Sequence, residues 1–185
     1  MIKKVQIFTT RGTGFLSNSI AFNSAPLSWM PQLKNVASHA GLMFTKEDGT
    51  KFYYETHSPD GWQGPKPIKW LEDWVAKDDK RWVRYRELNL TQQEMNKVWV
   101  RAAEKLMDPA WMDYRELQIA GMLLRRIFKF RVKMSPSPVC SEAVAKMLYP
   151  YYDLRIWPGK RPCGFDEITP WWIQVIPLQR VDDLL

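Results

Sequence analysis

The sequence predicts an α+β domain in which an antiparallel sheet packs on helices. Three β-type segments come first, at residues 3–10, 38–45 and 51–57, and the Asp48-Gly49 pair between the last two is a strong hairpin signal. Segments with helical periodicity follow. Strands that precede helices, rather than alternating with them, favour an α+β fold with an antiparallel sheet.

The other elements of the first half follow from local signals. Gly12 and Gly14 turn the chain out of its first strand into a short helical segment. Residues 57–67 are rich in Gly and Pro and predict a loop. Residues 68–75 predict a short amphipathic helix, and residues 81–88 alternate like a further strand.

The second half is predicted to be mainly helical. Thr91 and Glu94 have the spacing of a capping box, which marks the start of the first helix. The predicted helices cover residues 91–107, 113–130 and 139–148. Prolines stop the second and third of them. Residues 172–178 predict a last β-type segment.

Length and composition limit the class of protein. The chain has 185 residues, 45% of them apolar and 25% charged, so one domain over residues 1–185 is expected. No signal peptide or stretch of about 18 apolar residues is present, and two cysteines make no disulfide framework. We therefore expect a cytoplasmic protein. The two cysteines and two histidines lack metal-ligand spacing, so neither a metal nor another cofactor is expected.

The net charge of +7 is partly concentrated in residues 125–133. Two interpretations remain open for this basic segment. It is either a solvated helix end, whose cations favour the helix dipole, or a surface that contacts phosphates or an anionic membrane. The sequence contains no helix-turn-helix, zinc-finger spacing or aromatic nucleic-acid motif, so nucleic acid is not the expected partner.

Cys140 opens the predicted third helix, where free backbone N–H groups stabilise a thiolate. A base for this thiol has to come from far away in the sequence, and His39 and His57 are the two histidines. Glu55 and His57 share one face of their strand by alternation, so either side chain can reach His39. From the residues alone, a buried structural cysteine is an equal alternative.

Three short motifs carry a resemblance to a known family: "SHAGLMF", "YYETH" and "VCSEAVAKML". They resemble the circularly permuted, NlpC-type branch of the papain-like cysteine hydrolases. This branch includes the bacterial YiiX-like proteins and, more distantly, lecithin–retinol acyltransferase. The resemblance implies a permuted papain-like fold, a bacterial or phage origin, and functional groups in the order histidine, polar residue, cysteine.

By this resemblance Cys140 is similar to the nucleophile, His39 to the general base, and Glu55 to the group that orients the imidazole. In the acyltransferase branch the third group resembles a second histidine, so His57 is the alternative to Glu55. The first-turn amide of Cys140 is the expected oxyanion donor. Cys163 matches no motif and is expected to be structural.

The implied activity is cleavage of an amide, ester or thioester bond through an acyl-cysteine intermediate. The implied substrate is a peptide, including peptidoglycan stem peptides, or an acylated lipid. Two alternatives share the fold: an acyltransferase that uses lipid or amine acceptors, and a binding module that has lost turnover.

Overall fold

The computed structural model describes residues 1–57, 60–112, 139–156 and 161–181. Its strands are β1 (Ile2–Arg11), β2 (His39–Lys46), β3 (Lys51–His57), β4 (Gly61–Pro67) and β5 (Trp82–Glu87). They form one antiparallel sheet of five strands in the order β4-β3-β2-β1-β5. The predicted α+β class and the antiparallel sheet are therefore confirmed for the described residues.

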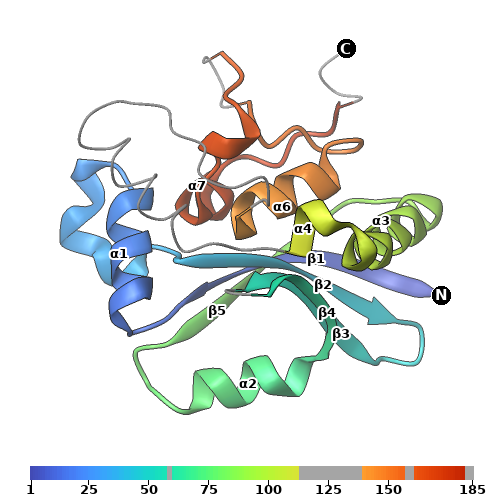
Figure 1. Ribbon diagram of the computed structural model, residues 1–185, viewed down its shortest axis with the longest axis horizontal. Coiled ribbons are helices and arrows are strands. Elements are labelled where there is room, and N and C mark those ends of the chain that lie inside the picture. The colour runs from blue at the N-terminus through green and yellow to red at the C-terminus, as the bar shows by residue number, and fades with distance from the viewer. Residues whose placement is uncertain (58–59, 113–138, 157–160, 182–185) are drawn as a thin grey trace.

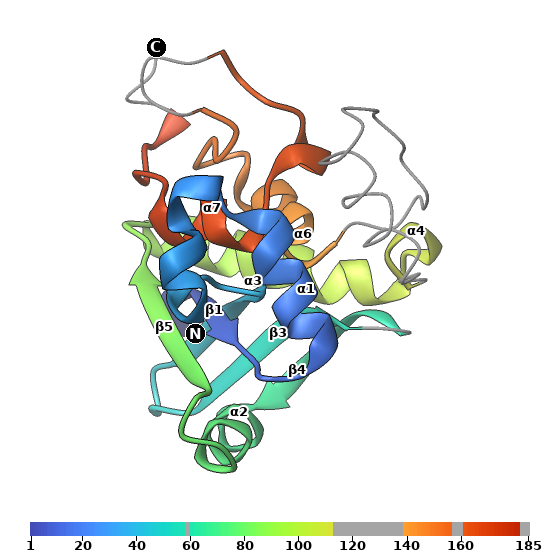
Figure 2. The ribbon, with the colours of Figure 1, turned by 90° about the vertical axis from the view of Figure 1, so that its left-hand side faces the viewer.

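Helices cover both faces of this sheet. They are α1 (Phe15–Ser24), α2 (Ile68–Ala76), α3 (Gln92–Glu104), α4 (Pro109–Met112), α6 (Cys140–Leu148) and α7 (Pro170–Val175). Short 3-10 segments occupy Leu27–Asn35, Lys105–Met107 and Phe165–Glu167. α3, α6 and α7 lie over one face, α2 lies under the other, and α1 stands at one end of the sheet (Figures 1 and 2).

The Asp48-Gly49 turn joins β2 to β3, as predicted. Gly49 has a φ of 84°, a left-handed conformation that glycine adopts without steric cost. Its amide donates to the Lys46 carbonyl at 3.0 Å. The turn sets a register in which Gly41 stands opposite Glu55.

The capping box of α3 is also confirmed. The Glu94 amide donates to Thr91 Oγ1 at 3.3 Å, and the Thr91 amide donates to Glu94 Oε2 at 2.8 Å. The 3-10 segment Lys105–Met107 continues α3 directly, so this helical stretch ends where the sequence predicts.

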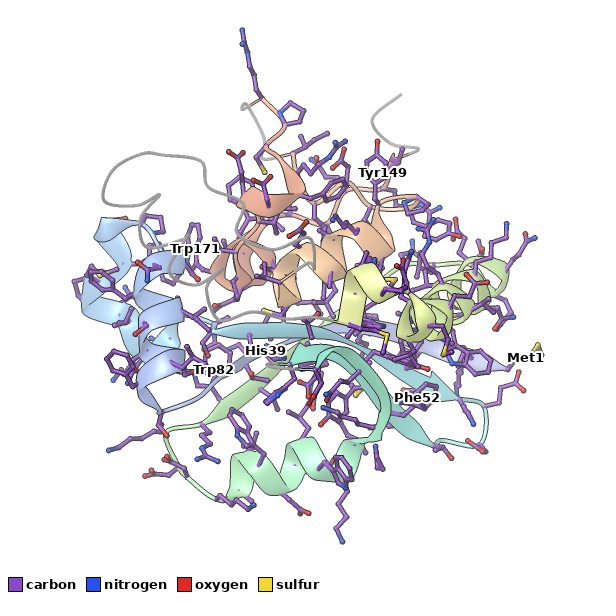
Figure 3. All side chains as sticks on the ribbon, viewed as in Figure 1. Met1, His39, Phe52, Trp82, Tyr149 and Trp171 are labelled. Carbon is purple, nitrogen blue, oxygen red and sulfur yellow. The ribbon has the colours of Figure 1, made fainter. Side chains whose placement is uncertain are left out.

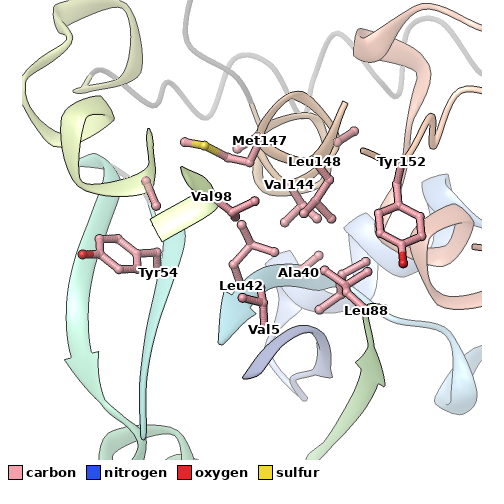
Figure 4. Packing of buried hydrophobic residues seen from close by; sticks show 14 of the residues in the cluster. Val5, Ala40, Leu42, Tyr54, Leu88, Val98, Val144, Met147, Leu148 and Tyr152 are labelled. Atoms are coloured by element: carbon pink, nitrogen blue, oxygen red, sulfur yellow. The ribbon is translucent and has the colours of Figure 1, made fainter. Parts of the chain in front are cut away.

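Alternation along β2 divides its side chains between two cores. Ala40 and Leu42 join the main core, against which Val144 of α6 packs (Figure 4). Met43 points to the opposite face and belongs to a smaller cluster with Leu71 of α2. Every residue of α6 except its lysine is buried, so this helix is held firmly on the sheet.

The prediction of a loop over residues 57–67 is wrong, because this segment contains β4. Pro65 and Pro67 lack an amide donor, but β4 is an edge strand, where proline is tolerated. Gly and Pro mask the strand in the sequence, and the pairing with β3 supplies what local propensity does not.

The prediction of a strand over residues 172–178 is also wrong, because the segment begins inside α7. The Thr169 hydroxyl accepts the Trp172 amide at 3.2 Å, and Pro170 occupies the first turn. Both features are helix-start signals. A short run of Trp, Ile and Val does not by itself distinguish a strand from a buried helix.

The helix predicted over residues 113–130 and the basic segment at 125–133 lie outside the described residues. In the part of the chain that the structure describes, we find no helix with the length and apolar content needed to cross a bilayer.

The close approach of β1 and β3 to Gly41 makes a prediction about stability. A Cβ atom at Gly41 would collide with the Phe8 ring and lie 2.6 Å from the Tyr54 carbonyl oxygen. We expect Gly41→Ala to lower the free energy of unfolding by about 1–3 kcal/mol, the usual cost of overpacking, in urea denaturation. Gly14→Ala is the control, since nothing lies within 4 Å of a Cβ there. Equal losses in both variants would contradict this account.

Candidate active site

Cys140 occupies the first position of α6. The Val139 carbonyl accepts the Ala143 amide at 2.8 Å, so the first helical hydrogen bond places Cys140 at the helix start. Amides of the first turn have no carbonyl partner within a helix and carry partial positive charge. The backbone amides of Ala40 and Ser141 lie near the Cys140 sulfur and lower the pKa of its thiol. These donors favour a thiolate.

His39, the first residue of β2, connects Cys140 to Glu55. Its Nε2 lies 2.8 Å from Glu55 Oε2, and its imidazole is also close enough to the Cys140 sulfur for each group to shift the pKa of the other. Because Nε2 faces the carboxylate, Nδ1 is the ring nitrogen left for the sulfur. His39 lies at the level of the sheet, between the helices on one face and α2 on the other (Figure 3). The structure thus brings together all three residues that the sequence singled out.

The Glu55 carboxylate of β3 contacts two nitrogen groups, one at each oxygen. Gly41 stands directly opposite it, so His39 is its diagonal neighbour on the same face. Its second oxygen, Oε1, accepts the Lys66 ammonium of β4 at 2.9 Å. The Glu55 side chain is only 12% exposed. Both oxygens of a largely buried carboxylate are therefore satisfied.

The electrostatics of the pair favour a charged imidazole and a charged sulfur. Burial alone disfavours an imidazolium at His39, but the Cys140 sulfur and the Glu55 carboxylate outweigh it and raise the pKa of His39 to about 10. Burial also disfavours a thiolate at Cys140, yet His39 and the backbone amides lower the pKa of this thiol. Both shifts favour the form in which the proton resides on His39 and the sulfur is a thiolate.

A cleft of about 700 Å³ opens onto His39 and Glu55. This volume is typical of pockets that bind small molecules. α1 and α2 contribute its apolar walls, with Leu16, Ile20, Trp70, Leu71 and Trp74. Cys140, which is 5% exposed, is not among the described residues that line the cleft. His39 is thus the residue that connects the cleft to the sulfur.

His57, the alternative to Glu55, also lines the cleft but lies exposed at the end of β3. Glu55 is the residue that the structure places against Nε2 of His39. Tyr53, Glu55 and His57 all reach the same cleft, as the alternation of β3 predicts.

Two further polar residues of α6 have structural partners. The Ser141 hydroxyl donates to the Ile168 carbonyl at 2.6 Å, and Glu142 pairs with Lys146 at 2.7 Å. Cys163 is half-buried, and burial raises the pKa of its thiol, which makes it less reactive than an ordinary cysteine.

Lys66 is the member of the site that sequence reasoning missed. It lies in the segment predicted as a loop, and a loop assigns no direction to its side chain. An edge strand could have been predicted here, because the segment contains the apolar Trp62 and follows another β-type segment, and proline is tolerated in edge strands.

No family model, curated protein or solved structure matches this chain. The function of this chain is therefore inferred from the geometry of the site. Among the described residues, no group of three His, Cys, Asp or Glu side chains is arranged to hold a metal ion.

Glu55 connects this site to acid stability. Burial raises its pKa, but His39 and Lys66 outweigh burial and lower it from 4.5 to about 2. Since the folded-state pKa is depressed, the stabilisation is complete above about pH 4.5 and is lost as the pH falls toward 2. We expect Glu55→Gln to flatten the dependence of the unfolding free energy on pH across this window, measured by urea denaturation. If the unfolding free energy depends on pH in the same way in the parent and in Glu55→Gln, the depressed pKa is wrongly assigned to Glu55.

Proposed function

We propose that this chain is a cysteine-dependent hydrolase that cleaves an amide, ester or thioester bond through an acyl-cysteine intermediate. One observation carries the proposal: the His39 imidazole hydrogen-bonds to Glu55 and interacts electrostatically with Cys140 at the start of α6. A nucleophile, a base and a group that orients the base are the parts of a cysteine-based triad.

In the first half-reaction the Cys140 thiolate attacks the carbonyl carbon of the substrate and forms a carbon–sulfur bond. The first-turn amide of Cys140 stabilises the oxyanion. The His39 imidazolium then donates its proton to the leaving amine, alcohol or thiol as the bond to that group breaks. The acyl group remains on sulfur.

In the second half-reaction the neutral His39 takes a proton from a water molecule that attacks the thioester carbonyl. The carbon–sulfur bond breaks, the thiolate leaves, and the carboxylic acid is released. Glu55 holds Nε2 throughout, which keeps the other ring nitrogen directed at the sulfur. An amine or hydroxyl acceptor in place of water would make the same site an acyltransferase.

We assign the fold to the circularly permuted, papain-like (NlpC-type) domains. Support comes from the chain order and the placement of the three residues. His39 lies on one strand, Glu55 on its neighbour, and Cys140 at the start of a later helix that packs on the same sheet. This is the order that the sequence resemblance implies.

The cleft supports both substrate classes, a peptide and an acylated lipid. Its leucine, isoleucine and tryptophan walls suit an acyl chain, and the polar Ser38, Asp73 and Lys77 suit a peptide backbone and charged groups. Contact of residues 125–133 with an anionic membrane surface remains a prediction, because these residues lie outside those described.

A thiolate–imidazolium pair predicts an unusually reactive thiol. In a Cys163→Ser background, we expect iodoacetamide to label Cys140 rapidly at about pH 6, where an ordinary thiol is less than about 1% ionised. His39→Ala should slow labelling at least about tenfold, since both the thiolate and its partner are lost. The rates are read by mass spectrometry.

The matched control is His57→Ala, which removes the chain's other histidine and should label like the parent. Slow labelling that rises only near about pH 8.5 and ignores His39 would contradict the hydrolase. That result would favour a binding module on the same fold.

A further inference from the structure

The pairing of β4 with β3 contains a β-bulge. Glu55 pairs with Gln63, whereas Tyr53 pairs with Lys66, so β4 carries one extra residue between the two pairs. In an uninterrupted ladder Lys66 would stand opposite Phe52 and share the face on which Phe52 enters the main core. The extra residue turns Lys66 to the face of Tyr53 and Glu55.

Gly64 makes this bulge possible. Its φ of 147° lies in a region that residues with a side chain rarely adopt. A Cβ atom there would collide with the Tyr54 ring and lie 2.9 Å from the Tyr53 carbonyl oxygen. Glycine therefore satisfies both the backbone conformation and the close approach of the two strands.

The bulge delivers a largely buried cation to the candidate site. Lys66 Nζ lies 2.9 Å from Glu55 Oε1, and the two side chains are 17% and 12% exposed. Removing an ammonium group from water is costly unless it is paired, so an arrangement that buries one beside a carboxylate needs a reason. The carboxylate that Lys66 holds is the one that holds His39.

We propose that Lys66 is a positioning residue of the hydrolase, delivered by the β4 bulge, which acts on Cys140 through Glu55 and His39. This inference rests on the proposed function. Lys66 fixes one oxygen of Glu55, so the other oxygen is held toward Nε2 of His39.

Lys66 also balances the charge of the cluster. Lys66, Glu55, His39 and the Cys140 thiolate alternate in sign and sum to zero. Without Lys66 the cluster carries net negative charge, which disfavours the thiolate and raises the pKa of the Cys140 thiol. The other titratable groups around the cluster are Tyr53 and His57 of β3, Asp73 and Lys77 of α2, and Glu142 of α6, paired with Lys146.

The test is the pH profile of Cys140 alkylation by iodoacetamide, with Cys163→Ser in every protein. The acid limb of this profile is the pH range in which the alkylation rate rises as the Cys140 thiol loses its proton. In Lys66→Met the acid limb should move to higher pH by about one unit, because a nearby cation is lost. Lys66→Arg, which retains the charge, should restore the limb toward its position in the parent. Lys69→Met, at an exposed position of α2, is the matched control and should not move it.

The outcomes distinguish a failure of the role proposed for Lys66 from a failure of the proposed hydrolase. An acid limb that stays in place in Lys66→Met, while the parent forms a thiolate at low pH, overturns the role of Lys66 and leaves the hydrolase standing. An ordinary thiol in the parent overturns the hydrolase itself. If Lys66→Met lowers only the maximal alkylation rate at high pH and leaves the acid limb in place, the substitution has caused a packing defect, and the role of Lys66 is likewise overturned. If circular dichroism shows Lys66→Met to be unfolded, Lys66→Gln, which keeps a donor for Glu55 but no charge, makes the same comparison.

Discussion

The register between β2 and β3 is the constraint on which the candidate site depends. The turn at Gly49 sets this register, and the register makes His39 a diagonal neighbour of Glu55 on one face of the sheet. On the opposite face the same strand offers Ala40, against which α6 packs. A single strand end therefore presents an imidazole to the carboxylate and a backbone amide to the Cys140 sulfur. A slip of one residue would turn the His39 side chain to the opposite face of the sheet from Glu55.

The charged forms of the site residues depend on one another. Each of Cys140, His39 and Glu55 is opposed by burial when it is charged, and each is kept charged by its neighbours. Desolvation offsets much of the attraction within a buried ion pair, so such a pair is by itself weak evidence for a role in stability. A buried chain of alternating charges beside a cleft agrees with the proposed function. Lys66 belongs to this set, and the bulge in β4 is the structural feature that brings it there.

Local signals in the sequence predicted much of the fold and offered Cys140, His39 and either Glu55 or His57 as site residues, and the family resemblance assigned their roles. The Asp48-Gly49 hairpin, the Thr91 capping box and a cysteine at a helix start each depend on residues close in the chain. β4 was missed because its strand character comes from pairing with β3 and not from its Gly- and Pro-rich residues. Lys66 was missed with it, since a bulge changes the face of a side chain in a way that no periodicity reveals.

The proposed function requires that His39 is an imidazolium at neutral pH, stabilised by Cys140 and Glu55. Nitrogen-15 NMR of the imidazole measures this state directly, and His57→Gln leaves His39 as the one histidine of the chain. We predict imidazolium shifts that persist well above neutral pH and a titration near a pKa of about 10. We also predict that Cys140→Ser lowers this pKa, because the thiolate is lost. A His39 ring that titrates near about 6.5, with or without the Cys140 thiol, would contradict the proposed function.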